Sequence, residues 1–262
     1  MSIVIYFSTH EAEAITPRLK QLFDDANFVL LEQDFREEDD RNLNLLNELS
    51  RGNLIVDDVL KVTSGRYGQF HPGFTNGLLP LIYRSGKLIL LERSHYSLYA
   101  VSTEFYPLFL QKFQDMPLAK ACRLLAENLS KQATFNKTRD EELAQQLAEV
   151  TSQNLTSIIL VIRGYGHRPS LEAALTAHGI PFTIVTSHTQ MSTFFIDEMV
   201  QKIIAGGRPT RIELLRSLVE QVETRATEFS PTIANIRATR DHVAAMSEMH
   251  CEKYLKRRSN LT

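Results

Sequence analysis

The chain has 262 residues, 43% of them hydrophobic and 23% charged, as is ordinary for a folded globular protein. Its formal net charge of −2 argues against a general affinity for nucleic acid, and no apolar run approaches the roughly 18 residues of a membrane span. The first residues lack the basic region of a secretory signal, and Cys122 and Cys251 have no spacing typical of a metal site. We therefore predict a cytoplasmic protein without membrane or nucleic-acid partners.

Two short apolar runs near the beginning predict the first two strands. Residues 3–7 lead into a polar stretch that contains His10 and Glu11, and residues 28–31 lead directly into Glu32. Apolar residues at helical spacing between the two runs predict a helix.

A third apolar run, residues 87–91, predicts another strand and ends at Glu92. A hairpin over residues 81–90 is the alternative interpretation, and it would remove this strand. The preceding segment, residues 52–73, follows no clear period. A long segment of that kind inside a domain is often functional.

Helices are predicted from about residue 103 to residue 154, with breaks at Pro107 and Pro117. The last of them carries an apolar stripe and is expected to begin at the Arg139-Asp140 pair.

The most informative stretch is residues 157–179, SIILVIRGYGHRPSLEAALTAHG. Its β-branched run without alternation predicts a strand that is covered on both faces, as in a parallel sheet. A glycine turn follows, and then a helix with His167 at its N-terminus and Gly179 at its end. Residues 181–185 predict one more strand.

Everything after this strand is predicted to be helical. Two amphipathic helices are followed by a third over about residues 230–256. We therefore expect an α/β domain over residues 1–190 that carries the site, with residues 191–262 forming C-terminal helices that pack on it.

The predicted fold is α/β, with a mixed, mostly parallel sheet flanked by helices and a C-terminal helical extension. The carboxyl ends of parallel strands share one edge, so His10, Glu32, Glu92 and His167 would converge there. Imidazoles and carboxylates are ligands of catalytic Zn, Mn or Co ions. The sequence therefore predicts a divalent-metal site or, without a metal, a Glu/His acid/base pair.

Each of these residues also has a structural interpretation. Glu32 or Glu92 alone fits a salt bridge at a strand end, and His10 or His167 alone fits a residue that caps a helix. The recurrence of such residues at four strand ends is what favours a shared site.

Several motifs within residues 1–186 follow an order that is typical of a known group. A strand ends at Glu32, the Arg139-Asp140 pair comes later, and Gly164-Tyr165-Gly166-His167 forms a G-x-x-H motif after a strand. This layout resembles the TraB/TIKI and erythromycin-esterase/ChaN-like group. The first motif departs from that pattern, because Phe7-Ser8-Thr9-His10 lacks the glycine and Glu11 follows the histidine instead of preceding it.

The resemblance implies hydrolysis, of peptides with a divalent metal in one branch and of esters in another, whereas a third branch binds haem. We therefore predict a hydrolase that acts on a small-molecule or peptide substrate. The candidate site residues are His10 and His167 as metal ligands or bases, Glu11, Glu32 and Glu92 as acid/base residues, and Arg139 as a charge stabiliser.

Two other classes of function stay open. Residues 163–168 lie at a predicted helix N-terminus, where they would hold phosphate or another anion. The chain would then be a ligand-binding protein, and binding of haem would place it in the same class. Alternatively, the site is vestigial and the last helix is the working surface, through which copies of the chain would associate into a homo-oligomer.

Overall fold

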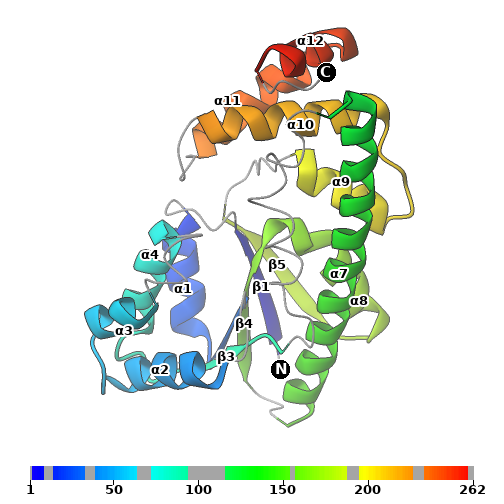
Figure 1. Cartoon of the computed structure of the whole chain (residues 1–262). Helices are drawn as coiled ribbons and strands as arrows, with labels where there is room; N and C mark the ends of the chain where they lie inside the picture. The colour runs from blue at the N-terminus through cyan, green and yellow to red at the C-terminus, as the bar shows by residue number, and fades with distance from the viewer. Residues whose placement is uncertain are drawn as a thin grey trace. The chain divides into compact units, whose positions relative to one another are not determined.

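The structure is a computed structural model, and it describes residues 2–8, 14–32, 39–63, 72–93, 116–153, 157–187, 195–226 and 233–258. Within these ranges the protein is an α/β structure with a parallel sheet, flanking helices and a helical C-terminal region (Figure 1), which confirms the predicted fold class. The strands are β1 (Ser2–Ser8), β2 (Phe28–Leu31), β3 (Leu88–Leu91), β4 (Ile158–Gly164) and β5 (Phe182–Thr186).

The strand order is β3-β2-β4-β1-β5, and each pair is parallel. β4 lies at the centre, between β2 and β1, which explains its uninterrupted apolar run. Because β3 pairs in parallel with β2, the alternative hairpin over residues 81–90 is excluded. The register places Leu31 beside both Leu91 and Ile162, so the residues that follow these strands share one edge.

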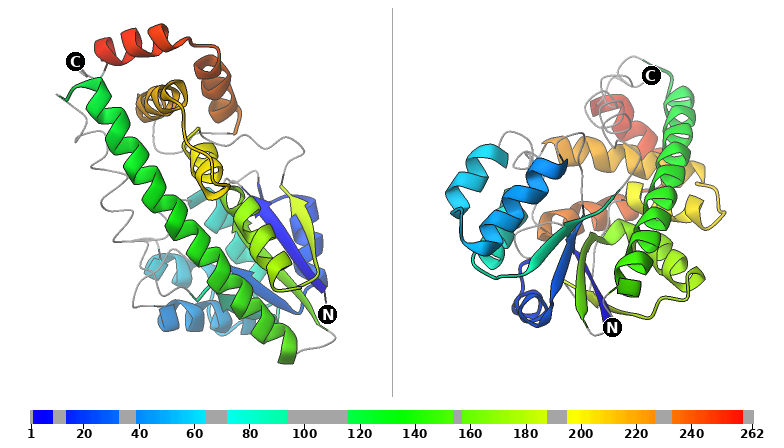
Figure 2. Two further views of the ribbon diagram at one scale, coloured as in Figure 1. Left: turned by 90° about the vertical axis from the view of Figure 1, so that its right-hand side faces the viewer. Right: turned by 90° about the horizontal axis from the view of Figure 1, so that it is seen from below.

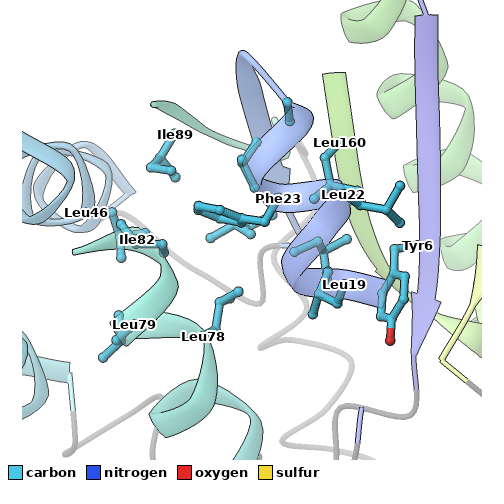
Figure 3. Close-up of a cluster of buried hydrophobic side chains, with 14 of the residues drawn as sticks. Tyr6, Leu19, Leu22, Phe23, Leu46, Leu78, Leu79, Ile82, Ile89 and Leu160 are labelled. Atoms are coloured by element: carbon cyan, nitrogen blue, oxygen red, sulfur yellow. The ribbon is translucent and has the colours of Figure 1, made fainter. Parts of the chain in front are cut away.

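The helices cover both faces of the sheet. On one face lie α1 (Pro17–Asp25), α2 (Asp39–Arg51), α3 (Val56–Thr63) and α4 (Pro72–Ile82), and their apolar side chains form a core with alternate strand residues (Figure 3). Against the opposite face pack the second half of α7 (Leu118–Gln153) and α8 (Arg168–Ala177), the latter preceded by the 3-10 turn η2 (Tyr165–His167).

The chain separates into two compact units. One comprises Met1–His95 and Arg139–Met191, and the other comprises Tyr96–Thr138 and Ser192–Thr262. From the sequence, we expected a single boundary between the two parts, near residue 190. The first half of α7 groups with the C-terminal helices, because its apolar side chains belong to their core.

The second unit contains α9 (Phe195–Ile204), α10 (Arg211–Ala226), α11 (Ile233–Ala244) and α12 (Glu248–Arg258). The single helix expected over residues 230–256 is therefore wrong. α11 ends at Ala244, and Ser247 caps the start of α12. The carbonyl of Ser247 accepts the N–H of Cys251, and its hydroxyl accepts the N–H of His250.

Two further expectations about helices need correction. Arg139-Asp140 does not begin a helix but lies inside α7, a 36-residue helix clearly visible in Figure 2, whose sequence has no glycine or proline to end it. α3 lies in the segment that showed no clear period. Its eight residues are too few to display one, and its two aspartates fall in the first turn, where the helix dipole favours them.

A side chain from α2 covers the outer edge of β3. Asn47 accepts the N–H of Ile89 (3.0 Å) and donates to its C=O (3.1 Å), which is how a further strand would pair. This edge of the sheet is therefore blocked against another chain at that position.

Candidate active site

A cluster of ionisable side chains lies at the carboxyl edge of the sheet, within the first unit. Three elements of the sheet and two helices supply it. Its members are Glu32 after β2, Glu92 after β3, Arg163 in β4, His167 and Ser170 at the start of α8, and Arg139 and Asp140 on α7.

Glu92 is held by two arginines. Arg139 binds it in the bidentate manner, from Nε to Oε1 (2.8 Å) and from Nη2 to Oε2 (2.7 Å), and Arg163 donates to the same Oε2 from Nη1. The carboxylate side chain is fully buried. Burial by itself would lower the pKa of Arg139, but the charge and hydrogen bonds of Glu92, together with the charge of Glu32, outweigh burial and raise this pKa. The pair is therefore ionic.

Asp140 is the second buried anion, and its side chain is also fully buried. It accepts hydrogen bonds from Arg163 Nη2 (2.6 Å) and from the hydroxyl of Ser170. Burial works to raise the pKa of Asp140, but the charges of Arg163 and of a protonated His167, together with hydrogen bonds from His167 and Ser170, outweigh burial and hold this pKa below its ordinary value. Asp140 is therefore a carboxylate.

His167 lies between two carboxylates. Its Nδ1 is 3.0 and 3.1 Å from the two oxygens of Asp140, and its Nε2 is 3.4 Å from Glu32 Oε1. His167 occupies the N-cap position of α8, as the sequence indicated, but its side chain makes no capping hydrogen bond. The imidazole therefore interacts with the carboxylates of the cluster and not with the backbone at the helix end.

Glu32 closes the cluster into a ring. Its Oε2 accepts the N–H of Gly164 (2.5 Å), and its Oε1 is 3.6 Å from Arg139 Nη2. Acidic and basic groups then alternate around the ring in the order Glu32, Arg139, Glu92, Arg163, Asp140, His167. With a neutral imidazole, three carboxylates against two guanidiniums leave one negative charge, and one proton on the imidazole brings the ring to neutrality.

Exposure divides the ring into two parts. The side chains of His167 and Glu32 keep 11% and 16% of their surface exposed, whereas those of Glu92, Arg139, Asp140 and Arg163 keep at most 2%. Only the first two can meet a substrate directly. The other four form the frame that holds them.

A metal site would need more ligands than the described part of the chain brings together. Among the described residues, no group of three His, Cys, Asp or Glu side chains could hold an ion. His167 Nε2 and Glu32 are two potential ligands that approach each other. His10 and Glu11, the predicted ligand and acid/base residue of the first motif, lie outside the described residues.

The structure brings together four of the predicted residues, Glu32, Glu92, Arg139 and His167. Sequence reasoning missed three members of the cluster: Asp140, Ser170 and Arg163, the last of which was considered only as an anion-binding group. Arg163 donates hydrogen bonds to Glu92 and Asp140, and Arg168 forms an ion pair with Glu172 (2.6 Å). The signal for Ser170 was its position one helical turn after His167.

Comparisons with protein-family models, curated proteins and solved structures give no match to this chain. None of the described helices is both long enough and apolar enough to cross a bilayer.

Proposed function

We propose that the chain is a hydrolase of esters or peptides in which His167 is the general base and Glu32 its partner. One observation carries this proposal: the imidazole lies between the buried Asp140 and the partly exposed Glu32. A histidine oriented by a buried carboxylate, with its other nitrogen facing the accessible side, is the arrangement that general-base catalysis requires.

In the reactive form, Nδ1–H donates to Asp140 and Nε2 is unprotonated. A water beside Nε2 attacks the substrate carbonyl carbon while its proton passes to Nε2. The imidazolium that forms lies between the carboxylates of Asp140 and Glu32, which stabilise its charge. When the C–O or C–N bond breaks, the proton moves from Nε2 to the leaving oxygen or nitrogen, and the base is regenerated.

The two arginines act at a distance from the substrate in this proposal. They hold Glu92 and Asp140 as buried carboxylates, so that the proton of the reaction stays on the imidazole. From the sequence, Glu92 was suggested as an acid/base residue and Arg139 as a charge stabiliser. In this proposal both belong to the frame that positions His167 and Glu32. The resemblance also implies a divalent metal, but the described residues bring only His167 and Glu32 together as ligands for one, and the steps above use no metal.

The test is a hydrolysis screen with 4-nitrophenyl esters of increasing chain length and fluorogenic peptides. It compares the wild type with His167→Gln and with His178→Gln. His178 is a matched control, since its Nε2 also faces a carboxylate, that of Glu141 (2.9 Å), but at the exposed end of α8.

Removal of a general base is expected to lower kcat by about 100- to 10,000-fold. His167→Gln should show this loss, and His178→Gln should keep wild-type activity. Equal activity of the two variants, or no hydrolysis of any substrate by the wild type, would reject the proposal.

A further inference from the structure

Arg163 joins the two halves of the buried frame. Its Nη1 donates to Glu92 and its Nη2 to Asp140 (2.6 Å), and Nη2 is also 3.2 Å from His167 Nδ1. The side chain is fully buried and comes from the central strand β4. Of all members of the ring, it alone lies within hydrogen-bond distance of both buried carboxylates.

The position of Arg163 bears directly on the imidazole. Guanidinium nitrogens only donate, so Nη2 can bond to Nδ1 only when Nδ1 carries no hydrogen, whereas the two closer oxygens of Asp140 accept a hydrogen from Nδ1. By binding Oδ1 of Asp140, Nη2 fixes this carboxylate so that both of its oxygens face Nδ1 (3.0 and 3.1 Å). A hydrogen on Nδ1 then has an acceptor, and Nε2 is left facing Glu32.

We propose that Arg163 is a positioning residue for His167: its guanidinium fixes Asp140 and thereby determines which imidazole nitrogen carries the hydrogen. Arg163 touches no substrate and acts through Asp140. The kinetic consequence rests on the proposed function, but the position of the hydrogen does not.

The chemistry of the guanidinium makes this role specific. A planar fork can bind two carboxylates at once, with one terminal nitrogen directed to each, whereas the lysine ammonium is a single point charge on a flexible stem. Lysine at this position would keep the charge and lose the simultaneous hold on Glu92 and Asp140. Charge and geometry can therefore be separated by substitution.

The direct experiment is nitrogen NMR of the full-length chain with labelled histidine side chains. The His167 signals are identified by their absence in His167→Gln. The wild type should show one tautomer, with the hydrogen on Nδ1. Arg163→Ala and Arg163→Lys should show a mixture of both tautomers, and Arg168→Ala, a surface arginine of the same turn, should match the wild type.

Chemical rescue distinguishes positioning from a purely structural role. Millimolar guanidinium should occupy the space left in Arg163→Ala and restore the single tautomer, whereas it should not change the tautomer mixture of Arg163→Lys, in which that space is filled. With a substrate from the screen, kcat should fall about 100-fold in Arg163→Ala with KM little changed, and guanidinium should recover it.

Three results would overturn the inference. The first is an unchanged tautomer in folded Arg163→Lys and Arg163→Ala. The second is a mixed tautomer that guanidinium does not correct. The third is an Arg163→Ala chain that stays unfolded with guanidinium while Arg163→Lys folds with the wild-type tautomer. If the wild type hydrolyses nothing, the proposed function fails, and the NMR result still decides the role of Arg163.

Discussion

Replacing Glu220 with glutamine removes a buried titratable group from α10 while keeping its shape. Oε2 of Glu220 accepts the N–H of Phe195, the first residue of α9 (2.6 Å), and a glutamine oxygen can accept the same bond. Burial raises the pKa of Glu220 to about 8, and the nearby acidic residues Asp197 and Glu198 act in the same direction. The Phe195 N–H and Arg240 favour the ionised form but do not offset the burial.

The raised pKa predicts how stability changes with pH. In the unfolded chain the carboxyl has its ordinary pKa of 4.5, so unfolding between pH 4.5 and pH 8 releases the proton of Glu220. The free energy of unfolding of the wild type should therefore fall as the pH rises through this window. The difference between the two pKa values is about 3.5, which corresponds to on the order of 5 kcal/mol at pH 8.

Urea unfolding from pH 4.5 to pH 8 measures this effect, followed by far-UV circular dichroism because the chain has no tryptophan. The free energy of unfolding of Glu220→Gln should equal that of the wild type near pH 4.5. As the pH rises toward 8 the wild type loses stability, so the variant should become progressively more stable than the wild type. A stability difference that does not change with pH would refute the reasoning.

Glu213→Gln on the same helix is a control of opposite sign. Burial opposes ionisation of Glu213, but the ammonium of Lys202 (2.8 Å) and the backbone N–H and hydroxyl of Thr210 hold its pKa below the ordinary value. Glu213→Gln should therefore be less stable than the wild type at pH 8. The deficit should shrink as the pH falls below the ordinary pKa of 4.5.

Three further substitutions should each lower the free energy of unfolding, measured by urea at one pH. Glu92→Gln should lower it by about 3–5 kcal/mol, because it leaves two buried guanidiniums without their shared anion; a loss below about 1 kcal/mol would contradict an ionic frame. Asn47→Ala should lower it by about 1–3 kcal/mol, since the N–H and C=O of Ile89 lose their partner, and stability equal to that of the wild type would argue against the blocked edge. Gly179→Ala should lower it by about 1–2 kcal/mol, because its φ of 66° is unfavourable for alanine, and a neutral result would contradict that backbone geometry.

The parts of the fold that could be predicted from the sequence are those fixed by local patterns. The apolar run before Gly164 indicated a strand with neighbours on both sides, and β4 is the central strand. Gly179 ends α8 with a positive φ, as a glycine at that position should. These features depend on a few consecutive residues, so the amino-acid sequence alone predicts them.

The frame of the candidate site depends on contacts between distant segments. Arg163 binds Glu92 and Asp140, which are 71 and 23 residues away in the chain. Arg163 follows the apolar run of β4 and precedes a glycine turn, and from the sequence it is therefore indistinguishable from an anion-binding arginine. The role of Asp140 could not be predicted either, because α7 continues through this residue and no helix end marks the position.

The central claim is that Glu32 and His167 act as one acid/base pair, and a double-mutant cycle on kcat tests it most directly. The cycle compares Glu32→Gln, His167→Gln and the double variant with the wild type on one substrate. Each single substitution should remove most of the activity, and the double variant should lose little more than His167→Gln alone. Losses that multiply, or full activity in Glu32→Gln, would contradict the claim.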